Sequence, residues 1–110
     1  MRFQRALAKV HETSDERPTA KVLHNYGVVC LRQGRLAEST RWLTSAISLR
    51  HDLGDWYREA KSRTVLGSVL LRAGRQREAA ADLRSALAVF GEVGDQRWAR
   101  RAQAHLGQTG

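Results

Sequence analysis

The residues in this sequence best suited to chemistry are cations that recur at a fixed spacing. Lys21, Lys61 and Arg101 lie 40 residues apart, and Arg32 and Arg72 form a second pair with the same separation. Lysine and arginine side chains bind carboxylates and phosphates through charge-assisted hydrogen bonds. The regular spacing therefore predicts a basic binding surface rather than a reacting centre.

Side chains that could carry out catalysis or hold a metal are few. The four histidines are His11, His24, His51 and His105, and none is paired with Cys30 at a spacing typical of zinc sites. The glycines do not form a phosphate-binding loop. Cys30 is predicted to be a small buried hydrophobe rather than a reactive thiol. We therefore predict that the chain is not an enzyme and uses no metal or cofactor.

The composition is that of a folded domain with a strong basic excess. The 110 residues are 42% hydrophobic and 27% charged, with a formal net charge of +8. No apolar run reaches about 18 residues, so the sequence predicts no membrane span. A single cysteine cannot form an internal disulfide, which fits a reducing compartment and leads us to predict a cytoplasmic protein.

The basic excess has two interpretations. It can indicate an acidic protein partner or nucleic acid. Alternatively, it can reflect a genome rich in arginine codons, since the arginines are spread along the chain rather than clustered in one run.

The elements that position these residues repeat with the same period. Gly27, Gly67 and Gly107 are 40 residues apart, and an aspartate recurs at positions 15, 55 and 95. A period of this size is typical of stacked supersecondary units. It divides the single domain into a half repeat (1–13), two full repeats (14–53 and 54–93) and a second half repeat (94–110).

Apolar residues recur at helical spacing within each unit, and no strand pattern competes. We expect an all-α fold of antiparallel helix pairs, with helices over about 3–11, 16–32, 36–50, 56–72 and 76–90 and a last one from about 96. Gly34 and Gly74 are placed to end helices in the left-handed conformation, and Asp55 and Asp95 to cap the next ones. Gly27 falls mid-helix, where glycine is unfavourable unless a neighbouring helix approaches closely.

These residues resemble the tetratricopeptide repeat. The pattern of the family appears here as Leu23, Tyr26, Gly27, Cys30, Gly34, Ser39, Leu43 and Ala46. It returns as Arg63, Leu66, Gly67, Leu70, Gly74, Ala79, Leu83 and Ala86. Arg63 departs from the usual Trp or Leu, and the closing proline is absent. The period of 40 exceeds the commoner 34 and is similar to a subset found in bacterial signalling ATPases, antibiotic regulators and kinesin light chains.

The resemblance implies an α-solenoid in which the first helix of each pair lines a concave groove that holds a segment of a partner protein. Helical spacing from the predicted buried face places ten residues on or near that groove. They are Lys21, His24, Asn25, Val28, Arg32, Lys61, Thr64, Ser68, Arg72 and Arg101. For Arg32 and Arg72 a simpler interpretation stands beside this one, since a cation is favoured in the last turn of any helix.

We interpret the chain as a protein–protein interaction module with a basic groove for an acidic segment. Because both ends fall inside a repeat, we expect a regulatory or sensor fragment of a larger bacterial signalling or transcription-regulator protein. The alternatives are a nucleic-acid-binding helical repeat that uses the +8 charge and a gene remnant without function. Unpaired end helices further predict weak self-association.

Overall fold

The computed structural model describes residues 15–109, and this part of the chain is helical with no strand. The five helices are α2 (Arg17–Arg32), α3 (Leu36–Asp52), α4 (Trp56–Arg72), α5 (Gln76–Val93) and α6 (Gln96–Leu106). The all-α prediction is confirmed. The helix expected over 3–11 lies outside the described residues. Among the described helices, none is long and apolar enough to span a membrane.

Each turn between successive helices contains a glycine in the left-handed conformation. Gly34, Gly54, Gly74 and Gly94 have φ between 72° and 79°, a conformation that other L-residues adopt at a cost. The helices α3 and α5 run two or three residues further than expected, because they continue until the turn that contains the glycine.

The predicted aspartate caps are present. The Asp55 carboxylate accepts a hydrogen bond from the backbone N–H of Arg58 at 3.1 Å, and Asp95 accepts from that of Trp98 at 3.0 Å. Asp15 accepts from the N–H of Arg17 at 3.0 Å, although it lies two residues before Arg17, the first residue of α2. Each carboxylate satisfies a donor that the first helical turn leaves without a partner.

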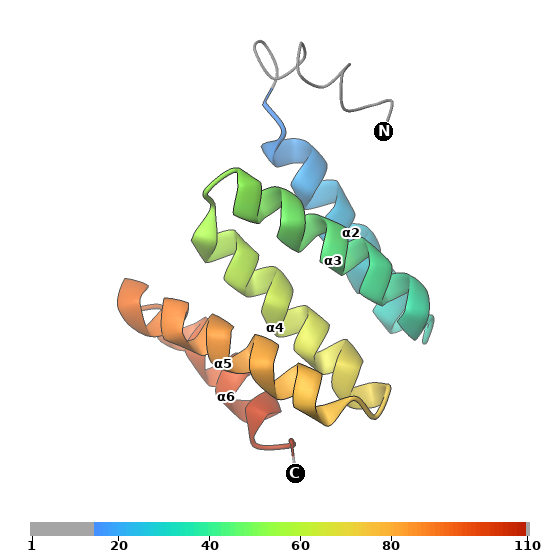
Figure 1. Cartoon of the computed structure of the whole chain (residues 1–110), viewed down its shortest axis with the longest axis vertical. Helices are drawn as coiled ribbons and strands as arrows, with labels where there is room; N and C mark the ends of the chain where they lie inside the picture. Colours follow the sequence, from blue (N-terminus) through green and yellow to red (C-terminus); the bar gives the residue numbers. More distant parts are fainter. Residues whose placement is uncertain (1–14, 110) are drawn as a thin grey trace.

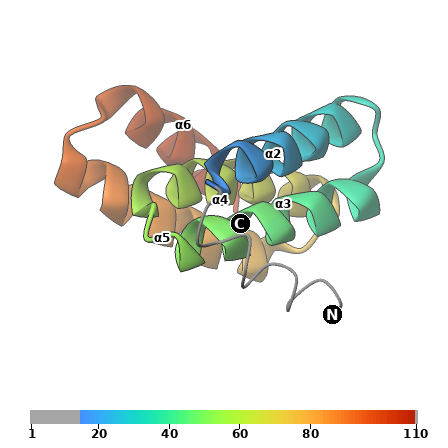
Figure 2. The ribbon, with the colours of Figure 1, turned by 90° about the horizontal axis from the view of Figure 1, so that it is seen from above.

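Successive helices pack as antiparallel pairs (Figure 1). Figure 2 shows α2 and α6 on the same side of the molecule, on either side of α4, while α3 and α5 lie on the opposite side. The first helices of successive pairs therefore share one side, as the family resemblance implied. The largest hydrophobic cluster joins α3, α4 and α5 through Leu43, Leu66, Val69 and Leu83.

Two glycines inside helices mark points where a neighbour approaches closely. A Cβ atom added to Gly27 would lie 2.5 Å from Cγ of Leu43, and one added to Gly67 would lie 2.6 Å from Leu83. The Ser39 hydroxyl also donates to the carbonyl of Gly27 at 2.7 Å. The predicted packing role of these glycines is confirmed, because no other residue fits without displacing a leucine.

One residue of the family pattern is exposed. Helical spacing predicts Tyr26 on the buried face of α2, but the structure corrects this, since 52% of it is accessible and it makes an edge contact with Trp42 at 5.2 Å. Val22 and Val29 are exposed on the same stripe of α2. The equivalent stripe of α4 is buried because α3 packs over it, whereas α2 has no such neighbour among the described helices.

Candidate functional site

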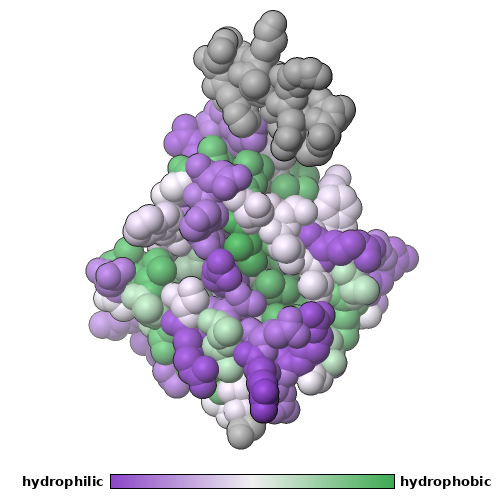
Figure 3. All heavy atoms as spheres, viewed as in Figure 1, coloured by the Kyte–Doolittle hydropathy of each residue, from purple (hydrophilic) through white to green (hydrophobic). Residues whose placement is uncertain are grey.

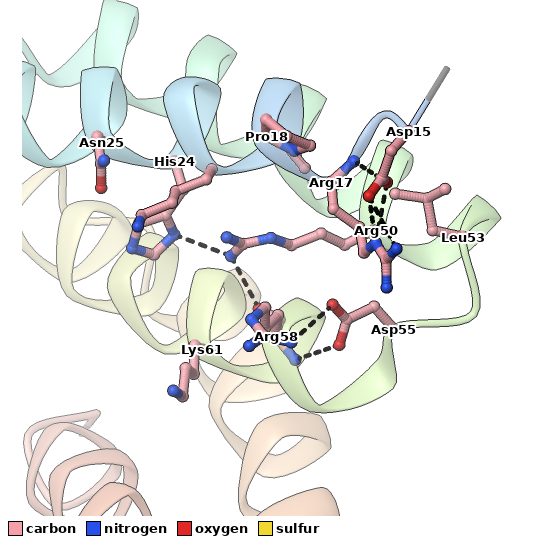
Figure 4. Close-up of a pocket in the computed structure, with 12 residues that line it drawn as sticks. Asp15, Arg17, Pro18, His24, Asn25, Arg50, Leu53, Asp55, Arg58 and Lys61 are labelled. Atoms are coloured by element: carbon pink, nitrogen blue, oxygen red, sulfur yellow. Dashed lines mark hydrogen bonds and ion pairs between the residues drawn. The ribbon is translucent and has the colours of Figure 1, made fainter. Parts of the chain in front are cut away.

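A cavity of about 610 Å³ lies between α2, the end of α3 and the beginning of α4 (Figure 4). We call it the α2–α4 cavity. Charged side chains dominate its lining. The cations are Arg17, Lys21, Arg50, Arg58 and Lys61, and the carboxylates are Asp15 and Asp55. Since five cations face two carboxylates, the cavity carries an excess of positive charge.

Four of the residues predicted for the groove meet in this cavity. Lys21, His24 and Asn25 line it from α2, and Lys61 lines it from α4. Lys21 and Asn25 are exposed, while His24 and Lys61 are half-buried. The spacing of 40 residues therefore does bring two lysines to one opening.

The other predicted groove residues lie elsewhere. Arg32 and Arg72 are exposed in the last turns of α2 and α4, while Val28 and Ser68 are half-buried outside the cavity lining. Thr64 corrects the prediction. It is only 2% exposed, and its hydroxyl donates to the carbonyl of Ala60 at 2.9 Å. A side chain enclosed in this way cannot contact a partner.

Arg50 lies at the base of the cavity with only 6% of its surface exposed. Its Nη1 donates to the Ser62 hydroxyl at 2.7 Å and to the carbonyl of Arg58 at 3.1 Å. The same Nη1 is 3.4 Å from Nδ1 of His24, and that Nδ1 is 2.8 Å from the Ser62 hydroxyl. Figure 4 shows the arginine reaching along the cavity toward His24.

The surroundings of His24 keep its imidazole neutral. Burial is the main cause that lowers its pKa from 6.5 to about 4, and the positive charges of Arg50 and Lys61 add to the effect. Because Nδ1 faces the cationic donor Arg50, it is the ring nitrogen that accepts, which assigns the proton of the neutral ring to Nε2.

Aromatic rings hold the second and third cations of the predicted row. The Lys61 ammonium lies 4.4 Å from the ring centre of Tyr57 and 5.5 Å from that of Trp98. The Arg101 guanidinium lies 4.6 Å from the Trp98 ring. Cation–π contacts of this kind orient a cation without neutralising it. Burial lowers the pKa of Lys61, and neighbouring Arg58 lowers it further.

Arg63, another arginine with little exposure, is paired with two carboxylates. Arg63 contacts Glu59 at 3.0 Å and Asp82 at 2.6 Å. At the rim of the cavity, Arg17 pairs with Asp15 at 2.8 Å. Arg50 differs, because no carboxylate among the described residues lies within ion-pair distance of it.

Three residues at the cavity, Arg50, Arg58 and Ser62, were not predicted from the sequence. A signal for the first was present in the repeat itself, because Arg50 aligns with Phe90, 40 residues later. A cation at a position that is apolar in the other copy indicates a local change of environment. Among the described residues, no group of three or more His, Cys, Asp or Glu side chains could hold a metal ion.

Comparison with known proteins gives one family. The model of the tetratricopeptide repeat matches residues 18–92, which is more than half of the chain. No curated protein matches the sequence. Tetratricopeptide repeats generally mediate protein–protein interactions, and the family is typically non-catalytic. The matched range contains α2, α3, α4 and nearly all of α5, with their periodic glycines and helix pairs, and the chain belongs to the tetratricopeptide repeat family.

Proposed function

We propose that this chain binds an acidic segment of a partner protein along the side formed by α2, α4 and α6. The observation that supports this is the placement of one cation on each first helix. Lys21 is on α2, Lys61 on α4 and Arg101 on α6, and these helices share one side of the molecule (Figure 2). An acidic segment that crosses the three helices meets a cation at each step.

The strength of such binding follows from the exposure of these cations. An exposed ion pair contributes only about 0.2–1 kcal/mol, because water and salt screen it. Binding by Lys21 and Arg101 alone is therefore weak and sensitive to salt. Lys61 is half-buried and held by two aromatic rings, so its contact with a carboxylate is screened less.

The test compares two charge reversals of equal size. Lys21→Glu with Lys61→Glu changes the proposed side, while Arg77→Glu with Arg84→Glu changes two exposed arginines of α5. The face that carries α5 mixes hydrophilic and hydrophobic residues (Figure 3). We expect the first pair to weaken the binding of a glutamate-rich peptide by about tenfold, and the second to have a much smaller effect. Equal losses in the two variants would show only non-specific attraction to the net charge.

Nucleic-acid binding is the competing function, and the net charge of +8 favours it. The same variants and a salt titration separate the two. Binding to an oligonucleotide should decrease steeply with salt and with either pair of reversals, because phosphates are contacted by whichever cations are near. Tighter binding to an oligonucleotide than to the peptide would favour this alternative.

We further propose that the module serves as a regulatory or sensor part of a larger cytoplasmic bacterial signalling or transcription-regulating protein. The support is the period of 40 residues, with the turns Leu53–Gly54–Asp55 and Val93–Gly94–Asp95, which is similar to the subset of the family in such proteins. Reading the surrounding genomic sequence for an ATPase or DNA-binding domain tests this. Neighbouring coding sequence of an unrelated kind would contradict it.

Self-association is a further part of the proposal. Val22, Tyr26 and Val29 form an exposed apolar stripe on α2 that a second copy could cover. Sedimentation at increasing concentration should show weak association in the original chain and less in a variant with Tyr26→Ser and Val29→Ser. A monomer at all concentrations would contradict this.

A further inference from the structure

We infer that the α2–α4 cavity is an oxyanion-binding site in which the buried Arg50 guanidinium is the principal ligand. The group that it binds is a carboxylate or a phosphoryl group. This inference rests on the proposed function and deepens it, because it assigns the place where an acidic group of the partner is held. The site can nevertheless be tested with a free anion.

Burial of the Arg50 cation is energetically unfavourable in the structure as described. The residue is 6% exposed, and its Nη1 donates only to neutral groups, Ser62 and the carbonyl of Arg58. The Nε–H and Nη2–H edge has no hydrogen-bond partner among the described residues. Asp55 also lines the cavity and attracts Arg50, but it lies beyond ion-pair distance. A buried cation with no carboxylate in direct contact is unfavourable, whereas an anion in the cavity would neutralise it. The chain does supply counter-charges elsewhere, since Arg63 has both Glu59 and Asp82.

The second repeat has an apolar residue in place of Arg50. Phe90 replaces Arg50 at the equivalent position, is fully buried, and packs on Trp98 with ring centres 5.8 Å apart. Ala102 replaces Ser62, the hydroxyl that orients Arg50. The helix framework therefore accommodates an apolar side chain here without difficulty. Its arginine is explained by a ligand better than by the needs of the fold.

The side chains that line the cavity suit an oxyanion. The Nε–H and Nη2–H groups of a guanidinium are parallel donors that match two oxygens of a carboxylate or a phosphoryl group. Lys21 and Lys61 line the same cavity, and their positive charges attract an anion even without direct contact. The assigned tautomer of His24 leaves its Nε2–H as one more donor in the lining.

Sulfate is a suitable probe, because it is an oxyanion whose charge does not change near neutral pH. Sodium sulfate is titrated at constant ionic strength, set with sodium chloride, while NMR follows the side-chain signals of His24 and Arg50. We expect saturable shifts of both signals. The pKa of His24 should also rise when sulfate binds, because an anion offsets Arg50 from α3 and Lys61 from α4, the two cations that lower it.

The decisive variant combines Arg50→Phe with Ser62→Ala, which installs the residues of the second repeat. Its sulfate affinity should decrease by about tenfold or more. The control is Arg84→Gln, which removes an exposed arginine of α5 outside the cavity and should leave the affinity unchanged. Circular dichroism melting checks that both variants are folded. Equal affinity in the original chain and the double variant, or shifts shared equally by all exposed cations, would overturn the inference.

A glutamate-rich peptide and inorganic phosphate form two further arms that identify the source of the anion. Tighter binding of the peptide assigns the group to a partner segment, and tighter binding of phosphate assigns it to a free anion. Sulfate or phosphate binding without peptide binding would support the site and contradict the proposed function. If the variant with Arg50→Phe and Ser62→Ala binds the peptide as tightly as the original chain, the proposed function is supported and the oxyanion site is contradicted.

Discussion

The α2–α4 cavity and the interior between α4 and α6 occupy equivalent places in two successive repeats, yet their side chains differ in kind. Three arginines of the first place align with three aromatic residues of the second. The pairs are Arg17 with Tyr57, Arg50 with Phe90, and Arg58 with Trp98. We call the three aromatic residues the aromatic cluster. Its rings are in contact, with centres 5.8–6.1 Å apart, and they fill the space that remains open in the first repeat.

The difference shows that one backbone framework can hold either a core or a site. In both repeats a mid-helix glycine receives a leucine of the next helix, Gly27 with Leu43 and Gly67 with Leu83. These contacts fix how closely the helices approach. The residues that follow near the helix ends are then free to be aromatic, which closes the space, or cationic, which leaves it open and polar.

The largest effect on stability should come from removing a ring of the aromatic cluster. Phe90→Ala removes a fully buried ring and should lower the free energy of unfolding by about 3–5 kcal/mol. Arg50→Ala should cost much less, because the arginine lies against an open cavity. Urea unfolding of both variants measures this. Equal losses of unfolding free energy in the two variants would show that the aromatic cluster and the α2–α4 cavity contribute equally to stability, contrary to the difference described above.

Overpacking the shared framework should have the next largest effect. Gly27→Leu and Gly67→Leu should each lower the free energy of unfolding by about 1–3 kcal/mol, because Leu43 or Leu83 must move. Gly91→Ala is the matched control, since it lies in α5 with no neighbouring atom within 4 Å of an added Cβ. Thermal melting measures all three variants. A large loss in only one of the two Leu variants would mean that the repeats differ in framework as well as in side chains.

The stability of the first full repeat should depend on pH because of His24. Its pKa is about 4 in the folded chain and 6.5 ordinarily, so the unfolded chain binds the proton first as pH falls. The stability that neutral His24 contributes is present above pH 6.5 and is lost toward pH 4. We expect this contribution to the free energy of unfolding to be about 1–2 kcal/mol, since the partly exposed ring is screened by solvent.

Urea unfolding at neutral and acidic pH, in the original chain and in His24→Gln, isolates that contribution. The variant should lose less stability on acidification than the original chain does. An identical pH dependence in the two would show that His24 protonates as easily in the folded chain as in the unfolded one. Thr64→Ser, at the equivalent position of the second repeat, serves as the control without a titrating group.

The smallest effect on stability should come from giving the α2–α4 cavity the apolar residues of the second repeat. Arg50→Phe with Ser62→Ala should change the free energy of unfolding by less than about 1 kcal/mol or raise it, since a well-packed apolar group often replaces a buried charge without loss. Calorimetric melting tests this. A loss of several kcal/mol would mean that the guanidinium is a structural link between α3 and α4, and the comparison would then have to treat it as part of the framework.

Much of the fold could be predicted because its signals are local or periodic. A glycine with positive φ lies in each turn between helices, and in two of these turns the aspartate that follows it caps the next helix. Gly54 with Asp55 and Gly94 with Asp95 therefore indicate boundaries on their own. The period of 40 residues then gives the order of the pairs. The prediction of Lys21 and Lys61 at one opening also depends only on this register, and both line the α2–α4 cavity.

The sequence by itself determined the helices, their pairing and the recurrence of a cation on α2, α4 and α6, because each depends on residue types at fixed separations. The tertiary structure decided which polar residues are accessible. His24 and Thr64 are repeat equivalents, yet the first lines a cavity while the second is buried, because α4 is packed between neighbours and α2 lies at the edge of the described helices. It also decided that Arg50 is buried with no carboxylate of the described residues at ion-pair distance, since the surroundings of a side chain depend on three helices at once and not on the period of any one of them.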